Sequence, residues 1–292
     1  MFKASVLIIF AAVVTFSPTL ARQPGQQQQP KPPPPPQGQR PPKKKLQASA
    51  NFAQYAGRDA SNRLIVGGAT RDILGEAERH NREGRESYEA GKYAEAAAAF
   101  GKLTELRPDS ASAFYSLGVA YEAAGRGKEA AAAYRRAAEL TTDTALKAVS
   151  LYNLGNVHAA AGEPREAVAA YRKVLGLAPR EAVAHYNLGL ALAAADQLPE
   201  AVNAFREALS LKPDFTDAHF NLGITHGRLE QLAEAAAAFR EAVRLKPDHA
   251  EAHFNLGLVH LALDDATAAR AEIETLQTLK PELAARLKSL SQ

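Results

Sequence analysis

The sequence has 292 residues, of which 46% are hydrophobic and none is cysteine or tryptophan. The lack of cysteine excludes disulfide bonds, thiolate metal sites and cysteine nucleophiles. The formal net charge of +3 is unevenly distributed, because residues 1–50 contain seven lysines and arginines and no acidic residue, which leaves −4 on residues 51–292. A basic face that binds nucleic acid is therefore not expected on the folded part.

Residues 1–21 have the pattern of a secretory signal peptide. Lys3 precedes an apolar run from Ala4 to Phe16, Pro18 follows, and small residues at Thr19 and Ala21 occupy the positions that a signal peptidase reads. A membrane-spanning helix needs about 20 apolar residues, so this run is too short. We expect cleavage after Ala21 and export to the periplasm or the exterior. The alternative is an uncleaved segment that anchors the chain to a membrane.

Residues 22–50 are rich in proline, glutamine and lysine, with five consecutive prolines from Pro32 to Pro36. Such a segment cannot pair its backbone donors and predicts an extended, disordered linker. We favour a spacer that holds the folded part away from a surface. A proline-rich ligand, or a contact of Lys43–Lys45 with an anionic surface, is the alternative. Residues 51–76 are expected to be a partly ordered lead-in.

One sequence unit recurs along the rest of the chain. An aromatic-polar-Leu-Gly motif is found at Tyr115–Gly118, Tyr152–Gly155, Tyr186–Gly189, Phe220–Gly223 and Phe254–Gly257, mostly 34 residues apart. An alanine follows each glycine after twelve residues, and a large apolar residue stands four residues further on. The spacing predicts two antiparallel helices per unit. Glycine should let the first helix approach the alanine of the second, with the large side chain filling the space where they diverge.

Proline and aspartate are expected to mark the connections between units. A proline eight residues after the large apolar residue should end the second helix of a unit. The aspartates that follow these prolines, Asp109, Asp214 and Asp248, are predicted to cap the next helix. Ala145–Lys147 is an insertion that should lengthen one turn.

These motifs resemble the tetratricopeptide repeat family. The resemblance implies an all-α fold, a right-handed α-solenoid of six helix-turn-helix repeats over residues 77–283, closed by a capping helix at 284–292. The repeats are 77–110, 111–144, 148–181, 182–215, 216–249 and 250–283. The first departs from the pattern, because Arg82 and Glu83 occupy its polar and leucine positions. The Asn-Leu-Gly units are also similar to the repeats of O-linked N-acetylglucosamine transferases.

The resemblance implies that the first helices line a concave groove that binds a protein segment. Asparagine recurs on the side of these helices that packing does not need, and its amide offers both a donor and an acceptor to an extended peptide backbone. The alternative is that each asparagine only bonds the neighbouring helix. The candidate groove residues are Ser116, Asn153, Asn156, Asn187, Asn221, Asn255, Tyr115, Tyr152, Tyr186, Phe220, Phe254 and Arg228.

The aromatic rings beside the asparagines should be at least half buried between neighbours. Basic residues are scarce on this face after the first repeat, so the expected ligand is a neutral or apolar extended segment rather than an acidic tail. The pairs His219 with His226 and His253 with His260 are seven residues apart, whereas a chelating pair on one helix is four apart. Packing roles are therefore expected for them, with no metal, cofactor or catalytic residue.

These observations favour an exported, non-enzymatic scaffold that binds a protein partner. Two alternatives stay open. The chain could be a structural stalk of an envelope complex, acting through its convex face and its proline-rich arm. Its groove could also be occupied by its own residues 46–70. The pattern carries no indication of an oligomeric state.

Overall fold

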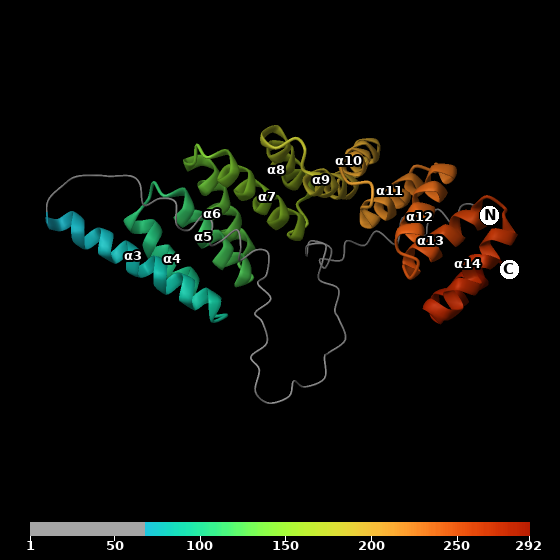
Figure 1. Ribbon diagram of the computed structural model, residues 1–292, viewed down its shortest axis with the longest axis horizontal. Coiled ribbons are helices and arrows are strands. Elements are labelled where there is room, and N and C mark those ends of the chain that lie inside the picture. The colour runs from blue at the N-terminus through green and yellow to red at the C-terminus, as the bar shows by residue number, and fades with distance from the viewer. Residues whose placement is uncertain (1–67) are drawn as a thin grey trace, which may run out of the picture. The chain divides into compact units, whose positions relative to one another are not determined.

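A computed structural model describes residues 68–292, with side chains from residue 74 onward. The predicted signal peptide, the linker, residues 51–67 of the lead-in and most of the segment 46–70 lie outside the described residues. The described part consists of helices and contains no strand (Figure 1). The helices are α3 (Gly68–Glu89), α4 (Tyr93–Leu106), α5 (Ala111–Ala123), α6 (Gly127–Leu140), α7 (Thr144–Ala160), α8 (Pro164–Leu177), α9 (Ala182–Ala194), α10 (Leu198–Leu211), α11 (Thr216–Arg228), α12 (Leu232–Leu245), α13 (Ala250–Ala262), α14 (Ala266–Leu279) and α15 (Pro281–Leu290).

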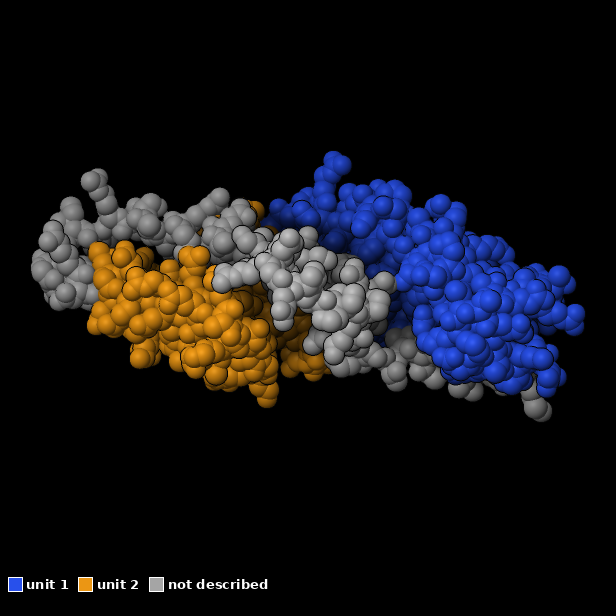
Figure 2. Space-filling view, turned by 60° about the horizontal axis from the view of Figure 1, so that its bottom comes forward, with its two compact units in different colours: residues 1–17, 164–292 blue, residues 18–163 orange. Residues whose placement is uncertain are grey.

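The described helices fall into two compact units, which Figure 2 shows in orange and blue. The N-terminal unit contains residues 68–163 and the C-terminal unit residues 164–292, so the division lies between the two helices of the third repeat. Within each unit every helix contacts the next one along the chain. The first helices also contact one another, α5 with α7, and α9 and α13 with α11. This is the helix-pair arrangement that the repeat predicts.

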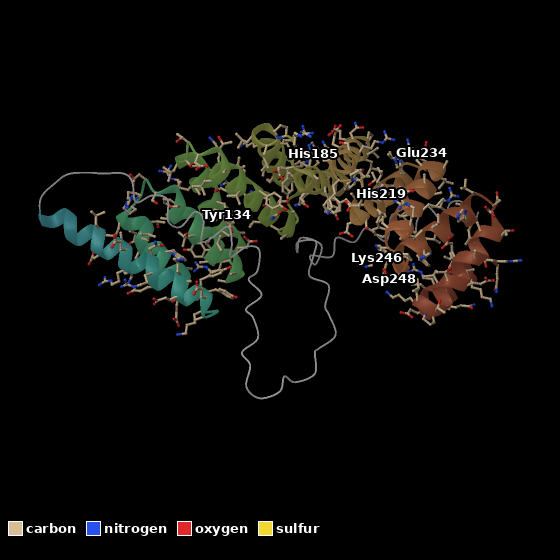
Figure 3. The ribbon with its side chains drawn as sticks, viewed as in Figure 1. Tyr134, His185, His219, Glu234, Lys246 and Asp248 are labelled. Carbon is tan, nitrogen blue, oxygen red and sulfur yellow. The ribbon has the colours of Figure 1, made fainter. Side chains whose placement is uncertain are left out.

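The glycine of the motif makes room for a side chain of the second helix. A Cβ atom on Gly223 would lie 2.7 Å from the ring of Phe239, and the same holds for Gly189 and Phe205. Both rings are fully buried, as is Tyr134 against Gly118 in the N-terminal unit (Figure 3). The ring therefore lies directly on the glycine, instead of filling a space beside a glycine-alanine contact.

Helix α15 completes the last repeat. Ile273 stands where other repeats have an aromatic ring, and Leu287 of α15 occupies the space beside Gly257. Lys280, just before α15, donates a hydrogen bond to Glu251 of α13 at 2.9 Å. The helix begins at Pro281, three residues earlier than predicted, since proline is well tolerated in the first turn of a helix.

The Pro-Asp pairs lie inside turns, so the predicted caps at Asp109, Asp214 and Asp248 are wrong. The N-cap residues of α5, α11 and α13 are Ser110, Phe215 and His249, one residue later in each case. The backbone N–H of each N-cap residue donates to the carbonyl three residues earlier, at 3.0 to 3.2 Å. The proline and aspartate are thus the central residues of a β-turn, and the helix starts only after that turn closes.

The insertion Ala145–Lys147 lengthens a helix and not a turn. Helix α7 has 17 residues, whereas α5, α9, α11 and α13 have 13. The Asp143 carboxylate accepts hydrogen bonds from the backbone N–H groups of Ala145 and Leu146 at 2.8 and 3.1 Å, and Leu146 is buried. A capped segment of good helix formers with a buried leucine extends the helix by about one turn.

The glycine-ring contact predicts a position-specific loss of stability. Changing Gly223 to Ala should lower the free energy of unfolding by about 2 kcal/mol, because the new methyl group overlaps the buried Phe239 ring. Changing Gly176 to Ala in α8 of the same unit should not lower it, because nothing lies within 4 Å of a Cβ at that position. Urea unfolding followed by circular dichroism measures both. Equal losses in the two variants would contradict the contact.

Candidate functional site

The first helices have one buried face and one partly exposed face, as α11 illustrates. Leu222, Gly223 and His226 are buried, whereas Asn221 and Ile224 are partly exposed. In the C-terminal unit this partly exposed face is formed by the adjacent helices α9 and α11, whereas α13 is buried all round from Ala252 to Ala262. The candidate residues divide between the units: those up to Asn156 belong to the N-terminal unit and the others to the C-terminal unit.

The aromatic residues of this face mostly serve packing. Tyr115, Tyr186 and Phe254 are buried, and Tyr152 and Phe220 are partly exposed. More than half of each ring is thus buried, as expected.

Two of these rings pack against the start of the next repeat as well as against their own repeat. The ring centroid of Tyr186 lies 5.9 Å from that of Phe205 on α10 and 4.6 Å from that of Phe215, the N-cap of α11. Phe220 has the same two kinds of neighbour, with His249 at 4.8 Å on the side of the next repeat. In these two cases the N-cap residue of the next first helix covers the ring before it, and little of the two rings remains for a ligand.

Asn221 uses its amide nitrogen inside the protein. Nδ2 donates to the backbone carbonyl of Asp217 at 2.8 Å and to the hydroxyl of Tyr186 on α9 at 3.1 Å. Because the carbonyl can only accept, this contact establishes which atom of the amide is nitrogen. The two N–H bonds of the amide match these two partners. Its Oδ1 remains as the polar atom for another molecule.

The other candidate asparagines differ in their hydrogen bonds and in their exposure. In the N-terminal unit Asn153 donates to the Tyr115 hydroxyl at 3.4 Å. Asn255 donates to the carbonyl of Glu251 at 2.7 Å, and its buried Oδ1 has no hydrogen-bond partner among the described residues. Asn156 and Asn187 are partly exposed, and Ser116 is buried. Asn153 and Asn221 therefore do bond a neighbouring helix, through their amide nitrogens, whereas Asn255 donates within its own helix.

The Arg228 side chain binds two groups of the preceding repeat. Its Nη1 donates to the carbonyl of Ala193 at 2.8 Å, and its Nη2 lies 2.7 Å from a carboxylate oxygen of Asp196. Asp196 has φ 61° in the turn after α9, where the first three repeats have a glycine at positive φ. Arg228 thus closes the C-terminal end of α9, where a cation is favoured, and its charge is neutralised.

A row of histidines secures the turns between repeats, a role that the sequence did not reveal. Nε2 of His185, His219 and His253 donates to the carbonyl of the proline six residues earlier, at 2.9 Å in each case. His185 and His219 are labelled in Figure 3. The recurrence of histidine at a 34-residue spacing was the available signal. His226 is buried and contacts Gln231, consistent with the packing role predicted for it.

His253 also has a charged partner. Its Nδ1 lies 2.6 Å from a carboxylate oxygen of Glu272 on α14. Because Nε2 donates to a carbonyl, both ring nitrogens are donors, which is the protonated form of the side chain. The hydrogen bond to Glu272 accordingly raises the pKa of His253 above its usual 6.5. Burial has the opposite effect on His260, whose pKa is lowered.

This pair predicts a pH-dependent contribution to stability. Changing Glu272 to Gln keeps an acceptor for Nδ1 but removes the negative charge. Since the folded-state pKa of His253 is raised, the charge contribution should be present in full below pH 6.5 and disappear as the pH rises through the raised pKa. The free energy of unfolding of the original chain should exceed that of the variant by about 1 kcal/mol at acidic pH.

The measurement is the free energy of unfolding of both proteins, obtained with a chemical denaturant across a pH series. The difference between the two values is then followed as a function of pH. The pKa of His260 is lowered chiefly by burial, which both proteins share, and Glu272 is the smallest of the causes acting on it, so most of its effect cancels. A difference that is the same at every pH would contradict the assignment of a charged His253.

Other kinds of site find little support within residues 68–292. No three histidine, aspartate or glutamate side chains come together there to hold a metal ion. No helix in that range has the length and apolar character needed to cross a membrane. A hollow of about 420 Å³ along α3 is lined by charged and polar residues of that helix alone.

Comparisons with known proteins agree with the helix pairs. The sequence model described as "Tetratricopeptide repeat" matches residues 81–144, 152–215 and 220–284. No curated protein matches the sequence. Among solved structures, YrrB, described as a TPR protein with an unusual peptide-binding site, is 26% identical, with a TM-score of 0.57 over 66% of this chain and all of that one.

Two further solved structures have the same fold at lower identity. PilW, a type IV pilus biogenesis factor, is 22% identical, with a TM-score of 0.56 over 72% of this chain and 98% of that one. MamA from Desulfovibrio magneticus RS-1 is also 22% identical, with a TM-score of 0.55 over 60% of this chain and 97% of that one.

Proposed function

Because the chain belongs to the tetratricopeptide repeat family, we propose that it is a non-enzymatic interaction scaffold that holds an extended segment of a partner protein against its first helices. The observation that carries this proposal is the repeated chemistry of their partly exposed face. In α9 and α11, an asparagine is followed three residues later by an aliphatic side chain, Leu190 or Ile224, and all four residues are partly exposed. A face that offers a hydrogen-bonding group and an apolar contact in two adjacent repeats suits a ligand that runs across the helices.

The charges of this face favour a neutral or apolar segment. Arg228, its predicted cation, is neutralised by Asp196, and Lys280 pairs with Glu251 on α13. An acidic tail would therefore find no uncommitted basic partner in these two residues. The similarity to YrrB, for which a peptide-binding site is described, adds support.

The scaffold proposal predicts that two asparagines are needed for partner binding. A chain with Asn187 and Asn221 both changed to Ala should lose at least tenfold in partner capture from native cells. Asn203, exposed on the second helix α10, provides the matched control, and its change to Ala should leave capture intact. Quantitative mass spectrometry of the captured proteins measures both.

If capture by the double variant equals that by the control, the scaffold proposal is rejected. That outcome would favour the structural stalk, which acts through the convex face and the proline-rich arm.

We further propose that the chain is exported, on the strength of the signal pattern in residues 1–21. The mature protein should begin at Arg22 and be recovered from the periplasm or the medium. N-terminal sequencing of protein from native cells measures this. An intact Met1 in the membrane fraction would instead show an uncleaved anchor.

A further inference from the structure

We infer that the ends of α3 and α5 form a docking site for a basic segment, and that its occupant is Lys43–Lys45 of the same chain. The site consists of Tyr88, Tyr93 and Glu122, all in the N-terminal unit. The inference goes beyond the proposed function, because it does not involve the candidate asparagines. It gives the three lysines of the linker a specific partner on the folded part.

Two tyrosines at the turn between α3 and α4 present aromatic surface. Tyr88 lies in the last turn of α3 and is partly exposed, and Tyr93, the first residue of α4, is 37% exposed. Their ring centroids are 5.3 Å apart and the ring planes are tilted by 59°. The face of a tyrosine ring attracts a cation such as the lysine ammonium group. The pair therefore offers a surface that suits a lysine side chain.

Glu122, in the last turn of α5, adds a negative charge beside these rings. It follows Tyr88 by one repeat and holds the equivalent position on the next first helix. The Tyr134 hydroxyl, labelled in Figure 3, donates a hydrogen bond to Oε2 of Glu122 at 2.6 Å. The charge of Glu122 also reaches Tyr88, because it raises the pKa of Tyr88 together with burial and Tyr93, which have larger effects.

No basic side chain within residues 68–292 pairs with Glu122. The cations of the two neighbouring turns have other partners, since Lys92 lies 3.2 Å from Glu95 and Arg126 lies 2.9 Å from Glu129. Glu122 is accessible from solvent, but the groups around its carboxylate exclude enough water to raise its pKa. An ion pair would have lowered that pKa. The carboxylate is thus open to a cation from another segment.

The C-terminal unit shows that the structure uses a cation at this place. The Arg228 side chain donates to the carbonyl of Ala193 at the end of α9. Ala193 occupies the position that Tyr88 and Glu122 hold on α3 and α5. The residue of α5 that corresponds to Arg228 is Ala123, and neither α3 nor α5 has a basic residue in its last turn. Because the carbonyl end of a helix favours a cation, the N-terminal unit has to obtain one from outside these helices.

Packing of a repeat does not require these three side chains. In the other repeats, the position of Tyr88 and Glu122 is occupied by Ala159, Ala193, Gly227 and Leu261. The position of Tyr93 is occupied by Gly127, Pro164, Leu198, Leu232 and Ala266. The tyrosines and the carboxylate are thus confined to the first two repeats, which are the repeats nearest to the basic linker.

The lysines are close enough in the chain to reach the site. About 20 residues connect Lys45 to Gly68, where α3 begins. A flexible chain of this length has an average end-to-end distance of about 25 Å and a maximal length of about 70 Å. Helix α3, with 22 residues, is about 33 Å long. Lys43–Lys45 can therefore meet the far end of α3, and the short connection gives them a high effective concentration there.

The test measures the distance between the lysine run and the site in the full chain. Because the chain has no cysteine, the changes Gln47→Cys and Ala90→Cys introduce two specific positions for dyes. Gln47 lies beside the lysines, and Ala90 is exposed in the turn next to the tyrosines. Single-molecule energy transfer then gives the ratio of docked to undocked molecules. This ratio should exceed one at low salt and fall at high salt, because salt screens charges at a surface.

Four variants of the labelled chain identify the groups involved. Changing all three residues of Lys43–Lys45 to Gln should lower the ratio about fivefold, and Glu122→Gln should do the same while keeping an acceptor for the Tyr134 hydroxyl. Tyr93→Leu should lower it about threefold, because leucine occupies this position in two other repeats but lacks an aromatic face. The control Glu105→Gln removes an exposed carboxylate of α4 and should leave the ratio unchanged. Circular dichroism checks that each variant is folded.

A low ratio in the original chain at low salt would overturn the inference, and so would a ratio that Glu122→Gln leaves unchanged. Transfer between two chains that each carry one dye would also overturn it, since the occupant would then be a second copy. None of these results bears on the scaffold proposal, which the asparagine variants test separately.

Discussion

A ring packed directly on a glycine determines how the two helices of a repeat lie against each other. Phe239 on Gly223 and Phe205 on Gly189 leave no space for a Cβ atom, and each ring is fully buried. Burial of such a ring contributes on the order of 2 kcal/mol or more, and the contact also sets the rotation of the first helix about its axis. With that rotation set, Asn221 and Ile224 lie on the partly exposed side. The candidate face is thus a consequence of the packing contact on the opposite side of the helix.

Adjacent repeats are connected by polar contacts to groups at the ends of their helices. A histidine of each first helix from α9 to α13 donates to the proline carbonyl of the turn before it, and Arg228 closes the end of α9. Phe215 and His249, the N-cap residues of α11 and α13, pack on the aromatic rings of Tyr186 and Phe220. Backbone groups left unpaired at helix ends are thereby satisfied. Side chains near the candidate face, such as Arg228 and Tyr186, therefore mainly stabilise the packing of the helices.

Under the proposed function, Asn221 combines an architectural and a binding role in one side chain. Nitrogen joins Asn221 to Tyr186 across two repeats, and oxygen remains for a ligand. An amide held in this way is preorganised, so a ligand does not have to overcome its rotational freedom. The same contact removes the ambiguity of an amide that can donate or accept.

The sequence by itself determined the repeat and its helix pairs, because a 34-residue period with glycine, alanine and an aromatic ring at regular positions allows few other arrangements. Local rules of helix formation succeeded less well. Asp248 lies in a turn and not at the helix start, and Ala145–Lys147 extends α7, because backbone pairing across a turn and burial of Leu146 outweigh the preference of a single residue. Only the tertiary structure decided which atoms of the candidate residues stay available. Tyr186 lies 35 residues from Asn221, and the two partners of Arg228 lie 35 and 32 residues from it, so these hydrogen bonds depend on how whole helices pack.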